Sequence, residues 1–228
     1  MTALAIAHRG DPFAQRENTL EAFAAAVAHG ADMIELDVRR TADGRAAVVH
    51  DPTLERLWGL RRRVADLPLT EIQALGVPDL AQALEAIPPH VQVMVDYEEE
   101  AVAGPALDAV LDAGALDRVV FSGDAFAGHR RLREREAGAR IAATWTADRP
   151  IPERLLDELG AEFYNPSGNV LGRDPDAVER MHARGTKVSV WTIDEPADMT
   201  FFLDLGVDAV ITNRVADLVG LLAPERAC

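Results

Sequence analysis

The sequence has few of the features that mark extracellular, membrane or nucleic-acid-binding proteins. Cys228 is the only cysteine among 228 residues, which excludes a disulfide within the chain and fits a reducing compartment. No stretch approaches the roughly 20 apolar residues that span a bilayer, so we expect no stable membrane insertion. The segment from Met1 to Ala7 has no basic region, and it predicts a first β-strand instead of a signal peptide, with a cytoplasmic location as the default.

Basic residues are also scarce. The chain carries 23 Lys and Arg against 38 Asp and Glu, a formal net charge of −15. A field of this sign repels nucleic acid and anionic membrane surfaces and attracts cations, and its more general effect is solubility. We therefore expect no nucleic-acid partner. The content of 48% hydrophobic and 27% charged residues is that of an ordinary globular protein.

Short apolar runs alternate with segments of helical spacing along the whole chain, which is typical of α/β folds. The predicted strands are Leu4–His8, Met33–Val38, Ala46–His50, Val91–Tyr97, Arg118–Ser122, Arg140–Trp145, Glu162–Tyr164, Lys187–Trp191 and Ala209–Thr212. The predicted helices include Asn18–His29, Ala101–Ala113, Glu153–Leu159, Pro175–Arg184 and Pro196–Leu205. No internal repeat or linker interrupts this order, so a single domain over residues 1–228 is predicted.

The second and third predicted strands are too close for a helical crossover. Only residues 39–45 separate them, and Asp43-Gly44 is a strong hairpin signal. Ala46–His50 should therefore return antiparallel. Eight strands are then left for a closed parallel (β/α)₈ TIM barrel with a short hairpin or loop insertion after strand 2. An open doubly wound sheet is the alternative, but no Gly-x-Gly-x-x-Gly pattern follows the first strand.

Carboxylates lie on two predicted strands, toward the ends where barrels place their active sites. Glu35 and Asp37 are two residues apart and so share one face of their strand. Like charges this close repel and are costly to bury. Either a divalent cation such as Mg²⁺ or Ca²⁺ or a pair of arginine salt bridges would compensate them. Asp96, at the end of the next apolar run, is the better candidate for a third metal ligand.

Glu98 repeats the two-residue spacing after Asp96, and two interpretations are open. The spacing favours a position inside the barrel beside Asp96. The run Glu98-Glu99-Glu100 is instead typical of a solvated helix start. We expect the inward position.

His8 and His50 end the first and third predicted strands. A lone histidine at a strand end is more often structural, but the hairpin returns His50 toward Glu35 and Asp37, and the first strand delivers His8 beside them. With Arg9 and a metal, two imidazoles are the parts needed for in-line displacement at phosphorus. The remaining histidines lie in predicted helix tails or polar loops and are given no role: His29, His90, His129 and His182.

These residues resemble the glycerophosphodiester phosphodiesterase family in order and approximate spacing over nearly the full chain. The matching motifs are Ala7-His8-Arg9-Gly10, Glu17-Asn18-Thr19, Ile34-Glu35-Leu36-Asp37-Val38, Thr41-Ala42-Asp43-Gly44, Val48-Val49-His50-Asp51-Pro52-Thr53-Leu54, Val190-Trp191-Thr192 and Gly206-Val207-Asp208-Ala209-Val210-Ile211-Thr212-Asn213. Each fragment alone is weak, whereas the ordered set is highly specific.

The resemblance implies a TIM-barrel hydrolase that converts a glycerophosphodiester, a small-molecule substrate, to sn-glycerol 3-phosphate and an alcohol. A cyclic phosphate or direct attack by water could lie on the route. The implied site comprises metal ligands Glu35, Asp37 and Asp96, acid/base residues His8 and His50, and substrate-binding residues Arg9, Glu17 and Trp191. A related enzyme acting on a lysophospholipid-type diester, or a non-catalytic barrel that binds a phosphorylated ligand or a cation, are the alternatives.

Two departures from the family bear on these alternatives. Relatives carry Glu-x-Lys on the third barrel strand, where this chain has Asp96 and Glu98, and the only lysine, Lys187, begins a strand at the other end of the barrel. A Ser-Ser-Phe-like strand end is altered to Phe121-Ser122-Gly123-Asp124. The charge reversal at Glu98 favours a non-catalytic binder, whereas the retention of two histidines favours an enzyme.

Overall fold

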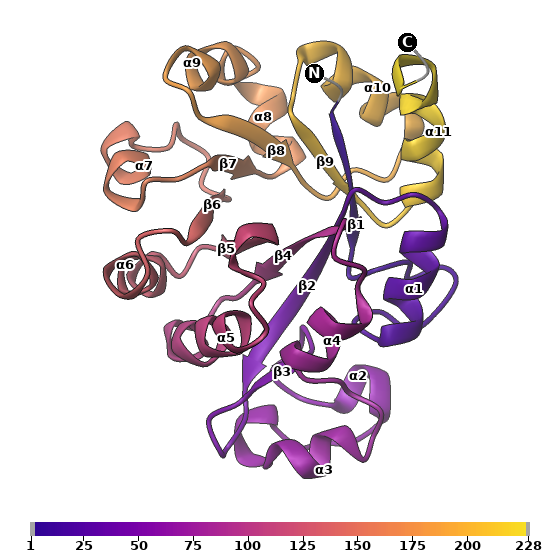
Figure 1. Ribbon diagram of the computed structural model, residues 1–228. Helices are drawn as coiled ribbons and strands as arrows, with labels where there is room; N and C mark the ends of the chain where they lie inside the picture. Colours follow the sequence, from indigo (N-terminus) through magenta and orange to yellow (C-terminus); the bar gives the residue numbers. More distant parts are fainter. Residues whose placement is uncertain (1–2, 227–228) are drawn as a thin grey trace.

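The computed structural model describes residues 3–226, so the prediction about Cys228 lies outside the described residues. Eight parallel strands form a closed barrel, in which β1 pairs with both β2 and β9, and β3 joins β2 antiparallel (Figure 1). The strands are β1 (Leu4–His8), β2 (Met33–Arg40), β3 (Ala46–Val48), β4 (Gln92–Asp96), β5 (Val119–Gly123), β6 (Arg140–Trp145), β7 (Phe163–Pro166), β8 (Lys187–Val190) and β9 (Ala209–Thr212). The predicted TIM barrel with a hairpin after its second strand is confirmed.

Helices surround the strands on the outside of the barrel (Figure 1). The helices are α1 (Leu20–Ala28), α2 (Glu55–Trp58), α3 (Leu69–Gln73), α4 (Leu80–Ala86), α5 (Glu100–Asp112), α6 (Phe126–Arg135), α7 (Glu153–Leu159), α8 (Gly168–Arg173), α9 (Ala177–Ala183), α10 (Pro196–Leu205) and α11 (Val215–Arg226), with 3₁₀ turns η1 (Val64–Asp66) and η2 (Leu116–Arg118). Within residues 3–226, no helix is long and apolar enough to cross a membrane.

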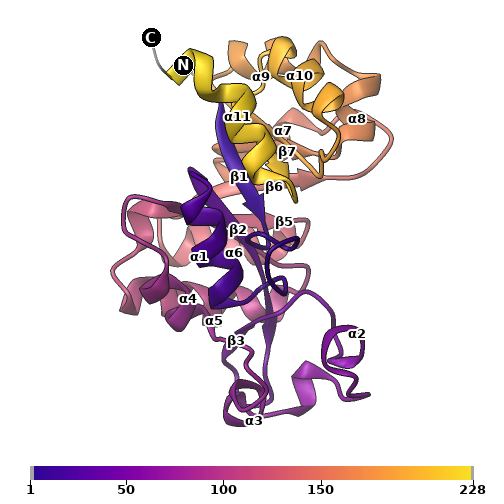
Figure 2. The same ribbon diagram turned by 90° about the vertical axis from the view of Figure 1, so that its right-hand side faces the viewer.

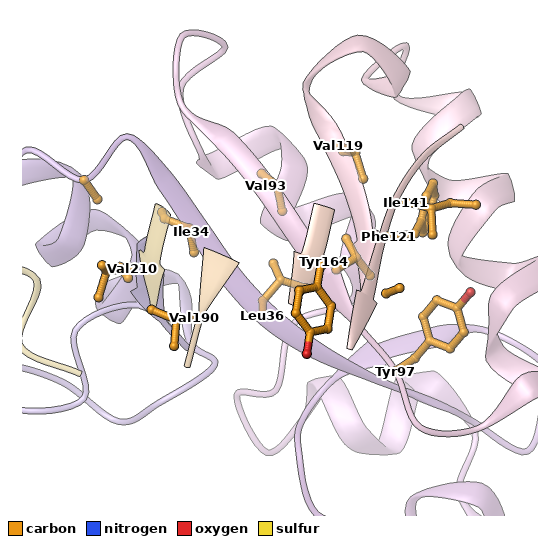
Figure 3. Packing of buried hydrophobic residues seen from close by; sticks show 14 of the residues in the cluster. Ile34, Leu36, Val93, Tyr97, Val119, Phe121, Ile141, Tyr164, Val190 and Val210 are labelled. Carbon is orange, nitrogen blue, oxygen red and sulfur yellow. The ribbon is translucent and has the colours of Figure 1, made fainter. Parts of the chain in front are cut away.

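The two faces of each barrel strand bury different layers. Outward residues such as Ile34, Leu36 and Phe121 belong to the large apolar cluster between strands and helices, as the sequence predicted for the second strand (Figure 3). The inward positions form a separate apolar cluster that fills the barrel: Ile6, Met33, Met94, Val120, Ala142, Phe163, Ala209 and Ile211. Because side chains alternate along a strand, the next inward residues toward the strand ends lie directly above this apolar layer. Those residues are polar.

The insertion between β3 and β4 is larger than a hairpin. Residues 49–79 include α2, η1 and α3, which lie together at one end of the molecule (Figure 2). They have their own buried cluster: Ala47, Val49, Leu54, Val64, Leu67, Leu69, Ile72 and Val77. Helices of four and five residues are too short to produce a periodic apolar pattern, which explains why the sequence did not predict them. The third strand also ends at Val48 instead of His50, so His50 lies in the loop that enters this insertion.

Candidate active site

Strand register brings the predicted carboxylates and His8 together. His8 is paired with Glu35, Asp37 with Asp96, and Asp96 with Ser122. Paired residues of a parallel sheet face the same side, so these side chains lie next to one another at the carboxyl ends of β1, β2, β4 and β5. Barrel enzymes carry their active sites at this end.

A pocket opens above these side chains. The predicted site residues that line it are His8, Arg9, Glu35, Asp37, His50, Asp96 and Trp191. The other residues of its wall are Met94, Glu98, Ser122, Gly123, Asp124, Thr144, Thr146, Asn165 and Ile211. Within the described chain, Glu17 is the one predicted site residue that does not line the pocket. Its carboxylate instead accepts a hydrogen bond from Arg9 Nη1 at 2.9 Å.

Three carboxylates on the strands below the pocket, Glu35, Asp37 and Asp96, are buried or half-buried and repel one another. Glu35 and Asp37 are 5% and 8% exposed. Burial, and then the charges of Asp37 and Asp96, raise the pKa of Glu35 well above its usual value. Burial and the charge of Asp37 raise the pKa of Asp96 to about 7, although a hydrogen bond with Ser122 opposes the shift. These groups therefore form an anionic site that a cation would relieve.

Arg9 compensates part of this negative charge. Its Nε lies 3.0 Å from Asp37 Oδ2, and its backbone N–H donates to Glu35 Oε2 at 2.9 Å. Asn18 Nδ2 also donates to Asp37 Oδ2, at 2.7 Å. The salt-bridge alternative is thus observed for Asp37. Arg9 adopts a left-handed backbone conformation with φ 59°, and Gly10 follows at φ 83°, where a Cβ would lie 2.7 Å from the Ala22 carbonyl carbon.

His8 is held by a chain of side chains that the sequence analysis did not identify. The Asn213 amide donates to Asp194 Oδ2 at 2.8 Å, and this contact leaves Asn213 Oδ1 as the acceptor for His8 Nδ1, also at 2.8 Å. His8 Nε2 then faces the pocket, 4.0 Å from Glu35 Oε2. Burial and the neighbouring Arg9 lower the pKa of His8. Asn213 follows β9 directly, and that strand-end position is the sequence signal that could have found it.

His50 is oriented in the same way. Its Nδ1 donates to Asp51 Oδ1 at 2.7 Å, which leaves Nε2 free for chemistry. Its backbone carbonyl accepts a hydrogen bond from Arg39 Nε at 2.7 Å. Hydrogen bonds from Arg56 are the main cause that lowers the pKa of Asp51 to about 2. Both predicted histidines therefore line one pocket, each with one ring nitrogen fixed.

Glu98 does not occupy the inward position beside Asp96, so that prediction is wrong. β4 has ended at Asp96, and the Glu98 carboxylate binds Arg39 Nη2 at 2.6 Å with its side chain 56% exposed. Glu99 binds the same guanidinium at 2.8 Å, and α5 begins at Glu100. The run Glu98-Glu99-Glu100 therefore leads into the start of α5, as the alternative interpretation predicted. Its first residue nevertheless lies at the rim of the pocket.

His129, to which we gave no role, is fully buried inside the wall that carries the pocket. Its Nδ1 accepts a hydrogen bond from the Tyr97 hydroxyl at 2.6 Å, and its Nε2–H donates to the Gly123 carbonyl at 3.1 Å. Gly123 lines the pocket at φ 128°, and a Cβ there would lie 2.1 Å from the Tyr97 carbonyl oxygen. His129 thus fixes the end of β5 against the segment that follows β4.

This buried imidazole makes stability depend on pH. Burial lowers the pKa of His129 from 6.5 to about 4, so the unfolded chain takes up a proton that the folded chain excludes. The stabilisation is complete above pH 6.5 and is lost as pH falls toward 4. The free energy of unfolding should therefore fall by about 2 kcal/mol between about pH 7 and pH 5.

We expect His129→Gln, which keeps a donor and an acceptor but does not titrate, to be less destabilised by acid than the wild type. Urea unfolding at both pH values measures this, with the exposed His90→Gln as the control. Equal pH dependence in all three proteins would contradict the assignment. The raised pKa of Asp96 changes stability with pH in the opposite direction. Because Asp96 is present in all three proteins, it does not affect their comparison.

The carboxylates fit a hard divalent cation by their chemistry. Glu35, Asp37 and Asp96 offer the oxygen donors that Mg²⁺ and Ca²⁺ prefer, and their mutual repulsion would be relieved by such an ion. Among residues 3–226, however, no group of three or more His, Cys, Asp or Glu side chains is already arranged to hold one. Binding would therefore require these side chains to reorient, with Asp37 partly released from Arg9.

Barrels that carry oriented imidazoles and a cationic group at this end have the architecture of hydrolytic enzymes for anionic esters, and this chain falls in that class. It belongs to the glycerophosphoryl diester phosphodiesterase family, whose sequence model matches residues 8–217. The family resemblance is confirmed.

Individual relatives match over nearly their whole length. A glycerophosphodiester phosphodiesterase from Caldanaerobacter subterraneus subsp. tengcongensis is 29% identical and covers 97% of this chain and 98% of its own. A probable glycerophosphodiester phosphodiesterase 2 from Mycobacterium tuberculosis is 32% identical over 95% of this chain and 89% of its own. The fold matches that of an Oleispira antarctica phosphodiesterase, solved in complex with the product sn-glycerol 3-phosphate, with a TM-score of 0.89, 20% identity and 97% coverage of both chains.

Proposed function

We propose that this protein hydrolyses glycerophosphodiesters to sn-glycerol 3-phosphate and an alcohol. The observation that carries the proposal is the pairing of His8 and His50 in one pocket, each held through Nδ1 so that Nε2 is available. A barrel that only binds a ligand needs no such pair of proton-transfer groups. Two relatives that match nearly the whole chain bear the name of this activity.

Three pocket residues have different roles in the proposed reaction. Arg9, which lines the pocket, binds the phosphate oxygens. His8, neutral because burial lowers its pKa, accepts the proton of the attacking hydroxyl at Nε2. A new P–O bond forms as the bond to the leaving alcohol breaks, and His50 donates a proton to that leaving oxygen. Both the cyclic-phosphate route and direct attack by water use this division of roles.

The proposal includes a divalent cation, Mg²⁺ or Ca²⁺, held by Glu35, Asp37 and Asp96. The burial of Glu35 and Asp37 and the raised pKa values of Glu35 and Asp96 support it. When bound, the ion supplies positive charge that offsets the phosphate and the charge that develops on it. Trp191 lines the pocket while its Nε1 donates to the Asn165 carbonyl at 3.0 Å, which fixes the ring as a wall for the substrate.

The test is an assay of purified protein on a panel of glycerophosphodiesters and a lysophospholipid-type diester, with Mg²⁺, Ca²⁺ or Mn²⁺ and without metal. The proposal expects metal-stimulated release of sn-glycerol 3-phosphate from the glycerophosphodiesters. Turnover of the lysophospholipid-type diester alone would replace the proposed substrate, and no turnover of any diester would overturn the activity.

Restoring the family lysine should have little effect, because the Glu98 carboxylate is exposed and already bound to Arg39. We expect Glu98→Lys to change KM for a glycerophosphodiester by no more than a few-fold, as is usual for a screened surface charge. Glu98→Gln is the control that removes the charge without reversing it. A fall in KM of about tenfold, equivalent to about 1.4 kcal/mol, would show that the side chain acts directly on substrate.

A further inference from the structure

Arg56, on helix α2 of the insertion, bridges two carboxylates that come from different parts of the chain. Its Nη2 donates to Glu17 Oε1 at 2.6 Å and its Nη1 to Glu17 Oε2 at 3.1 Å. Its Nε donates to Asp51 Oδ2 at 2.7 Å and its Nη2 to Asp51 Oδ1 at 3.1 Å. The guanidinium itself does not line the pocket in the described chain. One side chain thus ties the loop after β1 to the loop after β3.

Each of these carboxylates holds a residue of the proposed reaction through an oxygen that Arg56 also binds. Glu17 Oε1 accepts from Arg9 Nη1 at 2.9 Å, and Asp51 Oδ1 accepts from His50 Nδ1 at 2.7 Å. The contacts therefore run without a gap from the phosphate-binding arginine to one of the two imidazoles. Planar, bidentate contacts of this kind restrict orientation more strongly than a single ion pair.

The charge balance around Arg9 also depends on Arg56. Arg9 contacts Glu17 and Asp37. Among the described residues, removal of Arg56 would leave Arg9 as the one arginine in contact with Glu17 and would leave Asp51 with none. Although burial opposes the shift, Arg56 and Arg9 together lower the pKa of Glu17, so this carboxylate stays ionised. Without Arg56, Glu17 would direct its whole charge at Arg9 and compete with the substrate phosphate for it.

We infer that Arg56 is a positioning residue for the proposed hydrolysis: through Asp51 it fixes the His50 ring, and through Glu17 it keeps Arg9 available to phosphate. The inference rests on the proposed function. We call these two sets of contacts the His50 arm and the Arg9 arm, and they have different kinetic consequences. Misplacement of His50 lowers kcat, because proton transfer to the leaving oxygen needs the right geometry. Greater pairing of Arg9 with Glu17 raises KM.

The experiment compares Arg56→Ala and Arg56→Lys with Arg62→Ala. Arg62 lies in the same insertion and is similarly exposed, and its side chain binds only Glu71 among the described residues. Arg56→Ala should lower kcat by roughly tenfold to a hundredfold, the usual cost of removing a group that orients a site residue, and should raise KM several-fold. Arg56→Lys keeps the charge but cannot make both bidentate contacts, so it should recover KM more than kcat. Arg62→Ala should match the wild type.

A double variant separates the two arms. Adding Glu17→Gln to Arg56→Ala removes the charge that competes for Arg9, so KM should return toward the wild-type value while kcat stays low. Melting temperatures and circular dichroism check that each variant is folded. If Arg56→Ala does not fold, Arg56→Lys is used for the test. Wild-type kcat and KM in the folded Arg56 variants would overturn the inference, as would a raised KM that Glu17→Gln leaves unchanged.

Failure of the proposed function would be distinguishable. If the wild type hydrolyses no glycerophosphodiester, calorimetric binding of sn-glycerol 3-phosphate still tests the Arg9 arm. Arg56→Ala should weaken that affinity several-fold and Arg62→Ala should not. Equal affinity in all three proteins would overturn the inference even where the wild type is an active hydrolase.

Discussion

His8→Ala and His50→Ala should each lower kcat by at least about a hundredfold, the usual scale for a general acid or base. Each imidazole lines the pocket, and its Nε2 makes no hydrogen bond to another described residue. Its loss therefore removes a proton-transfer group and leaves the apolar barrel layer intact. Both variants should therefore fold with cooperative melting. Steady-state kinetics on a glycerophosphodiester, paired with thermal unfolding, measures both statements.

His90→Ala is the matched control, because His90 is an exposed loop histidine outside the pocket. It should turn over substrate at the wild-type rate. A His8 or His50 variant with near-normal kcat would show that the residue is structural, and the two-histidine division of roles would be wrong.

Removal of divalent metal should abolish hydrolysis, and added Mg²⁺ or Ca²⁺ should restore it. The physical reason is the group formed by the buried Glu35 and Asp37 and the half-buried Asp96. Burial, and then mutual repulsion, raises the pKa values of Glu35 and Asp96. Because only the folded chain brings the three together, the metal should also raise the melting temperature. Titrating the metal into chelated protein while following both activity and melting provides two independent readouts.

Asp96→Asn removes one candidate ligand charge and should weaken the metal-dependent rise in melting temperature. Asp108→Asn is its control, since Asp108 is exposed and binds Arg135 on the outside of the barrel. Full activity in excess chelator, or the same melting shift in Asp96→Asn as in the wild type, would contradict the metal assignment.

The barrel could be predicted because its information is local. Alternating apolar residues such as Ile34 and Leu36 mark a strand, and Asp43-Gly44 marks a tight turn, whatever the rest of the chain does. Site residues at strand ends follow from the same logic, since a closed parallel barrel gathers the ends of all its strands at one mouth. His8, Glu35 and Asp96 could be placed together for this reason.

The partners of these residues could not be predicted, because they depend on contacts between distant segments. Asn213 binds His8 across 205 positions, and Arg56 binds Glu17 across 39. Glu98 shows the same limit: the two-residue spacing was correct for a strand, but β4 ended at Asp96 and Arg39 bound the carboxylate.

His129 had a local signal that we missed. It lies three residues before the buried Leu132 in α6, a spacing that puts both on one helix face. The burial of His129 follows from that spacing. Its partners Tyr97 and Gly123, in contrast, come from the neighbouring part of the barrel wall.

The most direct test of the proposed activity is phosphorus NMR of the purified protein with sn-glycero-3-phosphoethanolamine and Mg²⁺, using His50→Ala as the blank for contaminating enzymes. We expect the diester resonance to be replaced by one phosphomonoester resonance, which sn-glycerol-3-phosphate dehydrogenase and NAD⁺ convert to that of dihydroxyacetone phosphate. Release of phosphoethanolamine, or loss of the diester resonance no faster than with His50→Ala, would contradict the proposed activity.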